Sequence, residues 1–349
     1  MRSRRLILIT PGDPAGIGPE IAAKIFRVRG RKSLRSRYPD MRFACVGARA
    51  PFEKLGTKIL PFDENVLAQD FGDFGDHIPL LSAPSISPKK SILLEGYQSG
   101  WAIERATRLI QAGMASALVT GPISKERLQR GGFKYTGHTD FLADLCGVDE
   151  VTMMLANEQL RISLATVHIG LKDVPKALTR EKLRRAVLHT VDSLKNWWGI
   201  SKPRVAVAAL NPHAGEDGLF GDEEIRVISP EIQSLQKDAK RRGYTLVGPL
   251  PADTLFANHV MARSQNRPEN RFDAVVCMYH DQGLIPVKLL DFPRTVNVTL
   301  GLPIVRTSVD HGVAFDIAGK NVADPSSLES AIELAVDIVR NQPQVRKRK

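Results

Sequence analysis

The segment MYHDQGLIPVKLLDFPRTVNVTLGLPIVRTSVDHGVAFDIAGK, residues 278–320, places polar side chains beside Gly or Pro or at the ends of short apolar runs. These side chains are His280, Asp281, Lys288, Asn297, Arg306, Asp310 and His311. Polar groups at strand ends form the sites of many α/β enzymes. Residues such as Asp and Asn also cap turns, but capping does not account for the whole set. The segment therefore predicts an enzyme active site whose residues come largely from one continuous stretch of the chain.

Short apolar runs and amphipathic stretches alternate along the chain. The runs that predict buried strands are residues 5–10, 43–47, 116–122, 204–210 and 273–279. Apolar residues at helical spacing predict helices over residues 19–28, 99–113, 180–198, 223–243 and 326–341. This alternation indicates an α/β fold with a largely parallel sheet. Residues 54–92, rich in Pro, Asp and Gly, interrupt the pattern and predict irregular connections with a short strand or two.

The length of 349 residues suffices for two domains or one large bilobed domain. No internal repeat or low-complexity linker marks a boundary. We place one boundary near Gly131 and Gly132 and a return crossing at residues 302–307. The expected first lobe is then discontinuous, residues 1–131 and 306–349, and the second lobe is residues 132–305.

Basic residues are concentrated in three short segments. The formal net charge is +11 at pH 7, and clustered Lys and Arg can bind nucleic acid. Residues 2–5, 27–37 and 346–349 hold 13 basic residues and no acidic one, which leaves 36 basic against 38 acidic residues elsewhere. No aromatic residue interleaves these clusters, as stacking on single strands would require. We therefore expect solvated surface and no nucleic-acid partner.

No apolar run approaches the ~20 residues that span a bilayer, and the apolar stretch near the amino terminus is too short for a signal peptide. The three cysteines, Cys45, Cys146 and Cys277, form no CxxC pair. Neither a disulfide framework nor a thiolate zinc site is indicated. We expect a cytoplasmic protein with no membrane partner, whose cysteines serve as small buried apolar side chains.

ITPGDPAGIGPE leads from a predicted strand through a Gly-rich turn into a helix opened by Pro19 and Glu20. Backbone N–H groups at such a helix start favour an anion or a cofactor, although a purely structural turn fits the segment about as well. Gly12, Gly16 and Gly18 do not fit GxGxxG, and no Walker Lys follows. The segment therefore argues against an ordinary dinucleotide-binding fold and against a P-loop.

Two further turns lead from strands into helices. In TGPISKE, Ser124 is the expected N-cap. In TGHTDFLA, Thr139 or Asp140 is the expected N-cap, and capping leaves His138 unexplained. His138 and Thr139 at a positive helix end can bind a phosphate or a carboxylate.

Three other histidines follow predicted strands: His168, His213 and His280. Three neutral imidazoles with an open coordination position suit a catalytic divalent ion such as zinc or cobalt. Asp253 and Asp281 could orient these imidazoles. A lone histidine is more often a satisfied polar residue than a ligand. Three histidines do not follow a predicted strand and are interpreted as structural or surface residues: His77, His189 and His259.

Lys288, Asn297 and Arg306 are spaced along the final predicted strands. Near a metal ion, Lys and Arg would hold a carboxylate or phosphate, Arg through two parallel hydrogen bonds. Lys288 taken singly could equally be a strand residue whose ammonium reaches solvent. No GxSxG motif occurs and no cysteine has a nucleophile setting, so acyl-enzyme chemistry has little support.

The chain resembles the 4-hydroxythreonine-4-phosphate dehydrogenase family of pyridoxal phosphate biosynthesis. The resemblance rests on motifs that follow in order along nearly the whole chain: TPGDPAGIGPE, TGPISK, TGHTDFLA, LNPHAGEDGLFGDEE, GPLPADTLF, MYHDQGLIPVK, VNVTLGLP and RTSVDHGVAFDIAGK. The first and last are also similar to segments of isopropylmalate and isocitrate dehydrogenases. The resemblance implies that superfamily's fold, in which two α/β lobes share a continuous sheet, the active site lies in the interlobe cleft, and loops bind the cofactor.

The resemblance also implies roles by matching position. The metal would be held by His168, His213 and His280, and the substrate by His138, Thr139, Lys288, Asn297 and Arg306. NAD or NADP would lie against Gly12 and against the loop residues His311, Gly312, Ala314 and Asp316. For the mechanism, the sequence leaves two roles open for Asp253 and Asp281: either could relay the proton, or merely orient a histidine. The implied metal is one divalent ion, zinc first and cobalt or magnesium otherwise. The implied assembly is a homodimer, joined through the second lobe, in which His280 serves the other subunit's site.

The implied reaction is oxidation of 4-phosphooxy-L-threonine by NAD, with loss of carbon dioxide to give 3-amino-2-oxopropyl phosphate. A paralogous dehydrogenase of D-threonate or D-erythronate 4-phosphate is the alternative, because the same clamp would serve either acid. The chain departs from the family pattern at IGLKDV, after His168, and at GHTD; the first departure could signal a shifted substrate preference. A phosphate acyltransferase on a related fold is opposed by the three histidines and the HGVAFDIAGK loop.

Overall fold

The computed structural model describes residues 5–63, 77–267 and 271–342. Of the basic clusters, Arg2, Arg4 and residues 346–349 lie outside these ranges. The chain divides into two compact units, the first of Met1–Glu150 and Leu302–Arg340 and the second of Val151–Gly301 and Asn341–Lys349. The sequence analysis placed the first boundary at residue 131. The first unit instead continues to Glu150, because helices α5 (Lys125–Arg130) and α6 (His138–Cys146) pack against α4 (Leu94–Gln111).

The described part of the first unit contains six strands in the order β3-β4-β2-β1-β5-β12, each parallel to its neighbours. Their bounds are β1 Arg5–Thr10, β2 Met41–Gly47, β3 Ile59–Pro61, β4 Ile78–Ser82, β5 Ala117–Thr120 and β12 Val305–Ser308. The strands β2, β5 and β12 are buried throughout, as expected for apolar strands covered on both faces. Because β1, β5 and β12 are parallel, the loops that follow them share one edge of the sheet.

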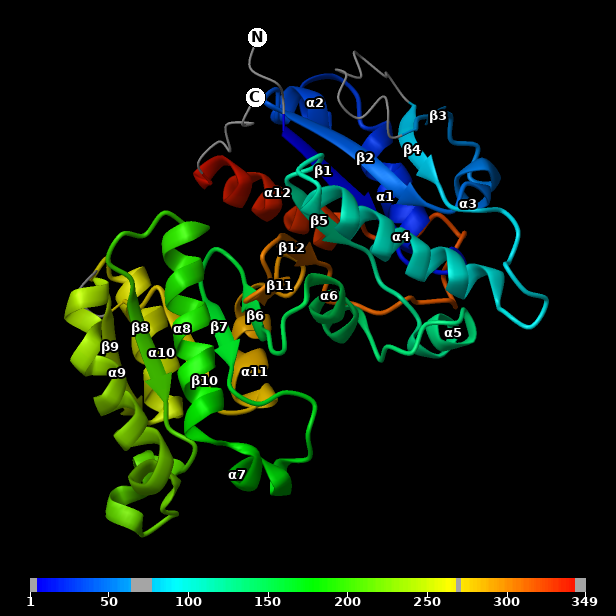
Figure 1. Cartoon of the computed structure of the whole chain (residues 1–349). Helices are drawn as coiled ribbons and strands as arrows, with labels where there is room; N and C mark the ends of the chain where they lie inside the picture. Colours follow the sequence, from blue (N-terminus) through cyan, green and yellow to red (C-terminus); the bar gives the residue numbers. More distant parts are fainter. Residues whose placement is uncertain (1–4, 64–76, 268–270, 343–349) are drawn as a thin grey trace. The chain divides into compact units, whose positions relative to one another are not determined.

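Helices separate these strands, and α4 lies across β1, β2 and β5 (Figure 1). The first unit's helices are α1 Gly18–Arg27, η1 Gly30–Lys32, α2 Leu34–Arg37, α3 Ala50–Lys54, α4 Leu94–Gln111, α5 Lys125–Arg130, α6 His138–Cys146 and α12 Ser326–Asn341. Apolar side chains three and four residues apart, such as Leu328, Ile332 and Val336 of α12, are fully buried. The basic segment 27–37 forms the end of α1, η1 and α2, and most of its basic side chains are exposed.

The described part of the second unit also contains six strands, in the order β11-β6-β7-β10-β8-β9. Their bounds are β6 Thr152–Ala156, β7 Arg161–Leu164, β8 Arg204–Ala208, β9 Thr245–Leu250, β10 Ala274–Cys277 and β11 Val296–Leu300. β6 is antiparallel to β7 and β11, and the other pairs are parallel. The core joins strand residues such as Ile162 and Val275 to Leu284 and Val287.

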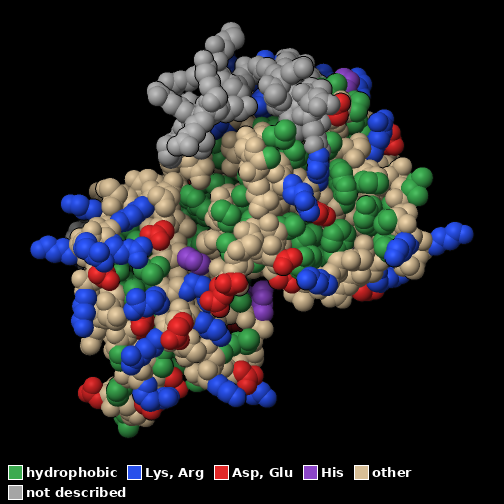
Figure 2. Space-filling model, viewed as in Figure 1, with side chains coloured by type: hydrophobic (Ala, Val, Ile, Leu, Met, Phe, Trp, Pro, Cys, Tyr) green, Lys and Arg blue, Asp and Glu red, His purple; other side chains and the backbone are tan. Residues whose placement is uncertain are grey.

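The second unit's helices are η2 Leu171–Asp173, α7 Val174–Ala177, α8 Arg180–Asn196, η3 Pro212–Gly218, η4 Glu224–Ile228, α9 Ser229–Arg242, α10 Ala252–Ser264 and α11 His280–Asp291. On the face of this unit seen in Figure 2, Lys and Arg side chains are interspersed with Asp and Glu and form no single basic patch. Among the described residues, no helix is both long and apolar enough to cross a membrane.

The predicted α/β class with a largely parallel sheet is confirmed. The five expected strand segments coincide with or overlap β1, β2, β5, β8 and β10, and the five expected helices coincide with or overlap α1, α4, α8, α9 and α12. The interrupted stretch 54–92 contains two short strands, β3 and β4, and its residues 64–76 lie outside the described ranges. Cys45 and Cys277 are buried free thiols, as expected.

Two local predictions were wrong. Lys288 lies on α11 and not on a strand: Leu284 and Val287 are buried three residues apart, a helical spacing, and Pro286 interrupts the hydrogen bonding of the helix without ending it. The residue before α6 is Gly137, so neither Thr139 nor Asp140 is the N-cap. Asp140 instead accepts a hydrogen bond from Gly137 N at 2.9 Å.

Candidate functional site

The Gly-rich turn after β1 closes against two other loops of the first unit. Asp13 N donates to Pro122 O at 2.9 Å, and Ile17 N donates to Val313 O at 3.0 Å. Gly12 has a φ of +90°, and a Cβ added there would lie 2.0 Å from Pro122 O. A Cβ at Gly16 would lie 2.8 Å from Val313 O. Glycine therefore permits the close approach that brings Gly12 into one assembly with the HGVAFDIAGK loop.

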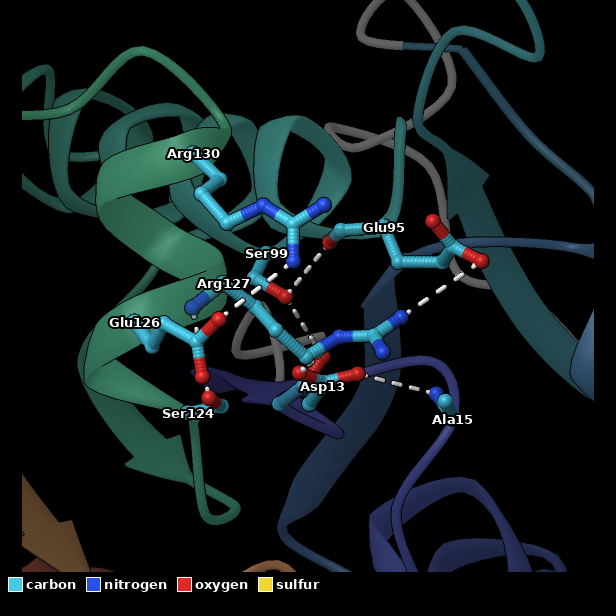
Figure 3. A network of polar contacts seen from close by, with 9 residues as sticks. Asp13, Ala15, Glu95, Ser99, Ser124, Glu126, Arg127 and Arg130 are labelled. Atoms are coloured by element: carbon cyan, nitrogen blue, oxygen red, sulfur yellow. Dashed lines mark hydrogen bonds and ion pairs between the residues drawn. The ribbon is translucent and has the colours of Figure 1, made fainter. Parts of the chain in front are cut away.

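Arg127 of α5 joins three segments around this turn (Figure 3). Its Nε lies 3.0 Å from Asp13 Oδ2, and its terminal nitrogen lies 3.5 Å from Glu95 Oε1. Its guanidinium carbon lies 5.4 Å from the centre of the Phe315 ring, within the range of a cation–π contact. Burial raises the pKa of Asp13 above its ordinary value, while the Ala15 N–H and the charge of Arg127 act in the opposite direction.

The sequence analysis missed both Asp13 and Arg127. The available signal was Asp13 itself, an acidic residue between the glycines and prolines of PGDPAG. Such a carboxylate has little room to reach solvent, and it is 1% exposed. A buried carboxylate requires a cation or several N–H donors, but nothing in the sequence named Arg127 as the cation.

Glu20 holds the far end of the HGVAFDIAGK loop. Its carboxylate accepts hydrogen bonds from Gly319 N at 3.0 Å and Ala323 N at 2.9 Å, and Lys24 Nζ lies 3.1 Å from it. Burial alone would raise the pKa of Glu20, but the hydrogen bonds from Ala323 N–H and Lys24 lower it below its ordinary value. The loop that contains Ala314 is therefore fixed at Ile17 and again at Glu20.

The same loop offers an unused polar atom. The Nε2 of His311 is buried and has no hydrogen-bond partner among the described residues, whereas its Nδ1 lies 3.0 Å from Gly312 O. Ala314 has a φ of +43°, and Asp316 is exposed. A tightly closed Gly turn beside a loop with an unpartnered ring nitrogen fits a cofactor that brings its own hydrogen-bonding groups.

His138 and Arg306 form a second group in the first unit. Arg306 is 3% exposed and donates to Thr120 Oγ1 from Nε at 3.1 Å and from a terminal nitrogen at 2.8 Å. Burial lowers the pKa of Arg306 to about 9, so the guanidinium stays charged at neutral pH. Burial, and then the charge of Arg306, lower the pKa of His138 well below its ordinary value. Within the part of the chain that the structure describes, the buried His138 Nε2 has no hydrogen-bond partner. Thr139, the second residue of α6, is exposed.

In the second unit, two of the three candidate metal ligands lie side by side. The ring centres of His168 and His280 are 5.6 Å apart, and His280 Nδ1 lies 2.6 Å from Asp281 Oδ1. Imidazole nitrogens with a carboxylate behind one of them are suitable donors for a divalent ion. However, the described residues of one chain contain no group of three or more His, Cys, Asp or Glu side chains that could hold a metal ion. Among the described residues of one chain, His168 and His280 therefore form a pair that does not include His213.

The third histidine, His213, lines a pocket of about 550 Å³ in the second unit. The pocket also contains both candidate catalytic carboxylates, Asp253 from the first turn of α10 and Asp281 from the first turn of α11. Its remaining lining residues are Leu210, Asn211, Pro212, Ala252, Phe256, Tyr279, Gln282, Ile285 and Pro286. Asp281 thus belongs to the pocket and to the His168–His280 pair, and it links the two.

Gln282, which was not among the predicted site residues, lines this pocket and connects two of its segments. Its Oε1 accepts from Met278 N at 2.7 Å, and its Nε2 donates to Ala209 O at 2.6 Å. These bonds join the start of α11 to the end of β8. The signal available in the sequence was its place in HDQG, two residues after His280.

Lys288 and Asn297 do not line this pocket. Lys288 Nζ lies 5.3 Å from the centre of the Phe292 ring, and Asn297 lies opposite Leu155 in the β11–β6 pair. His259 and His189 are structural, as expected: His259 Nε2 lies 3.1 Å from Gln159 O, and His189 Nδ1 lies 3.0 Å from Thr152 Oγ1.

A family model described as "Pyridoxal phosphate biosynthetic protein PdxA" matches residues 51–335. A relative from Bradyrhizobium diazoefficiens, named "Putative D-threonate 4-phosphate dehydrogenase", is 44% identical over 355 residues and covers 96% of each chain. The 4-hydroxythreonine-4-phosphate dehydrogenase of Caulobacter vibrioides is 43% identical over an alignment of 348 positions that covers 96% of this chain and 97% of that one. The crystal structure of 4-hydroxythreonine-4-phosphate dehydrogenase from Klebsiella pneumoniae is similar with a TM-score of 0.81 and 35% identity, over 96% of this chain and 98% of that chain.

Proposed function

Since this chain belongs to the PdxA family of pyridoxal phosphate biosynthetic proteins, we propose that it oxidises 4-phosphooxy-L-threonine with NAD and decarboxylates the product to 3-amino-2-oxopropyl phosphate. Its enzyme class is that of its relatives, an oxidoreductase of the 4-hydroxythreonine-4-phosphate dehydrogenase type. The observation that carries the proposal is the pocket in which His213 meets Asp253 and Asp281. We assign the reaction to the cytoplasm, in keeping with three free cysteines.

The chemistry needs one hydride acceptor and one proton carrier. NAD, when bound, would supply the acceptor for the hydride that leaves C3 of the substrate, and the C3 hydroxyl would lose its proton to a group of the protein. The resulting β-keto acid breaks its C1–C2 bond, carbon dioxide leaves, and the electron pair forms an enolate that takes a proton at C2. Asp253, on the pocket wall, is the candidate that moves protons, whereas Asp281 holds His280 by its Nδ1 and orients that ring.

A divalent ion, zinc first and cobalt or magnesium otherwise, held by His168, His213 and His280 would supply Lewis acidity at the C3 oxygen. His138, Thr139, Lys288, Asn297 and Arg306 would hold the phosphate and carboxylate of the substrate. Gly12, His311, Gly312, Ala314 and Asp316 would hold NAD, or NADP in its place, in the loops after β1 and β12.

Exposed apolar side chains support a homodimer with shared sites. Large apolar side chains are exposed beside each of the three histidines. They are Val167, Ile169 and Leu171 near His168, Leu219 and Phe220 near His213, and Ile285, Leu289 and Phe292 along one face of α11 after His280. Leu289 is 82% exposed and Leu171 is 68% exposed. Exposed apolar patches of this kind mark association surfaces. A second copy packed here would cover them, and the proposed metal would then be held by His168 and His213 of one chain and His280 of the other.

Subunit mixing tests the shared site directly. His168→Asn and His280→Asn homodimers should each be inactive in NAD reduction. After subunit exchange, each heterodimer would contain one site with both changes and one intact site, so activity should recover to about a quarter of the wild-type value for random pairing. A site contained within one chain predicts no recovery. His259→Asn mixed with His168→Asn is a control, because His259 lies away from the pocket lining.

The alternative is a dehydrogenase of D-threonate or D-erythronate 4-phosphate, and the Bradyrhizobium relative favours it. Initial rates of NAD and NADP reduction, measured with each acid and with zinc, cobalt or magnesium, separate the candidates. The proposal expects the highest kcat/KM with 4-phosphooxy-L-threonine and loss of activity after thorough chelation. Full activity in metal-free enzyme would exclude the metal, and a higher kcat/KM with a C4 sugar acid would exclude the substrate.

A further inference from the structure

The loop that presents His213 follows an unusual backbone path. Residues His213, Ala214, Gly215, Glu216 and Asp217 all have positive φ, from 42° to 81°. Four of the five are not glycine, and L side chains enter this left-handed region rarely and usually singly. A run of this kind persists only when the surrounding structure determines it.

One buried carboxylate holds the backbone of this loop in that conformation. Glu224 is 3% exposed and begins the π-helical turn η4. Its Oε1 accepts hydrogen bonds from Leu210 N at 2.8 Å and Asn211 N at 2.9 Å, and its Oε2 accepts from Asn211 Nδ2 at 2.8 Å. Glu223 Oε2 accepts from the same Asn211 Nδ2 at 2.7 Å. The two residues that lead into the left-handed run are therefore held by Glu224 through three bonds.

The glycines of the loop allow it to close on this carboxylate. A Cβ at Gly215 would lie 2.9 Å from Glu224 Oε2 and 3.0 Å from Gly221 O. A Cβ at Gly221 would lie 2.5 Å from Asn211 Nδ2. Gly215 in the middle of the left-handed run and Gly221 beyond its end thus pack against Glu224 and Asn211 with no room for a side chain.

We propose that Glu224 is a positioning residue that, through Leu210, Asn211 and the left-handed run, holds His213 in the pocket shared with Asp253 and Asp281. Both carboxylate oxygens of Glu224 act as acceptors, so a glutamine cannot replace it. An amide nitrogen in place of Oε2 would face the Asn211 amide nitrogen, donor against donor. The role of His213 as a metal ligand rests on the proposed function, but its placement by Glu224 does not.

The test compares Glu224→Gln with Asp222→Asn, a matched exposed carboxylate two residues earlier that pairs with Arg226. Metal-free protein labelled with ¹³C at histidine reports the imidazole of His213, which is assigned through His213→Asn. The His213 signal should shift or broaden in Glu224→Gln and stay unchanged in Asp222→Asn. Zn²⁺ titration should then show affinity about 10- to 100-fold weaker in Glu224→Gln. NADH affinity should stay unchanged, because the proposed NADH site lies in the first unit.

A second pair of variants avoids charge changes. Gly215→Ala adds a methyl group against Glu224, and Gly199→Ala adds one at a left-handed position whose nearest neighbour would be 3.9 Å away. The first should reproduce the Glu224→Gln effects and the second should not. An unchanged His213 signal in both Glu224→Gln and Gly215→Ala overturns the proposal, as does an equal loss of NADH and Zn²⁺ affinity. If wild-type protein binds no Zn²⁺, the proposed metal role fails, while the imidazole signal still decides the positioning claim.

Discussion

Replacing Arg127 by methionine should destabilise the protein by leaving the Asp13 carboxylate buried and without its cation. Asp13 is 1% exposed, and its Oδ2 has Arg127 as an ion-pair partner at 3.0 Å, while its Oδ1 keeps the Ala15 N–H at 2.9 Å. Removing one partner of a buried pair costs about 3–5 kcal/mol. The Arg127 side chain is 23% exposed, so water can reach the vacated space. We therefore expect the low end, about 3 kcal/mol at pH 8.

The loss should depend on pH in a defined direction. Burial already raises the folded-state pKa of Asp13 above its unfolded value of 3.8, and loss of Arg127 raises that pKa further. A carboxyl group with a raised folded-state pKa destabilises the fold where the unfolded chain is ionised, and the penalty disappears as pH falls below the unfolded pKa. Urea unfolding should therefore show a larger deficit for Arg127→Met at pH 8 than at pH 5.

Arg130→Met is the matched control. Arg130 lies on the same helix and pairs with Glu126 at 3.3 Å, but both side chains are mostly exposed, 62% and 77% (Figure 3). An exposed pair contributes about 0–1 kcal/mol. The double variant Asp13→Asn with Arg127→Met should recover part of the loss, since the uncompensated charge is gone. Equal stability of Arg127→Met and Arg130→Met at pH 8, or an Arg127→Met deficit that is the same at both pH values, would refute this reasoning.

Three further outcomes are expected. His138→Asn should reduce the loss of folding stability between pH 7.5 and pH 5.5. Burial lowers the folded-state pKa of His138, so the wild-type fold loses stability as this histidine becomes protonated in the unfolded chain below about pH 6.5. Equal losses of stability in urea unfolding of the two proteins would contradict this prediction. Leu289→Glu, at a side chain 82% exposed, should leave the melting temperature unchanged but reduce the molar mass measured by light scattering to that of one chain. Gln233→Glu, on the exposed surface of α9, is the control. An unchanged molar mass of Leu289→Glu would count against α11 as part of the dimer interface. Arg306→Lys should raise KM for the phosphorylated substrate about 10- to 100-fold, because Lys cannot reproduce a two-pronged guanidinium contact; an unchanged KM in steady-state kinetics would remove Arg306 from the binding site.

Local patterns account for what the sequence predicted well. The apolar runs that form β1, β2, β5, β8 and β10 are short and bounded by Gly, Pro or Asn, and such patterns depend on neighbours along the chain. The same holds for the helix start after Ser124, whose side chain accepts from Arg127 N at 3.3 Å. The strand predicted at Lys288 was wrong because GLIPVK contains a proline and is too short for its pattern to distinguish a strand from a helix.

Groupings of polar side chains from distant segments were decided by tertiary structure. The order of strands brings the loop after β1 beside those after β5 and β12, and only then do Asp13 and Arg127 meet. The pairing of β7 with β10 likewise brings the residues after both strands together, and His168 meets His280 there.

The sequence by itself determined the α/β class, the family and the residue types available for chemistry, because periodicity and motif order are properties of the linear chain. The tertiary structure decided which of those residues cooperate. It linked Glu224 to the loop of His213, buried Arg306 beside His138 and brought His168 beside His280. The physical reason is that burial, hydrogen bonding and charge pairing depend on distances across the fold, which spacing along the sequence does not encode.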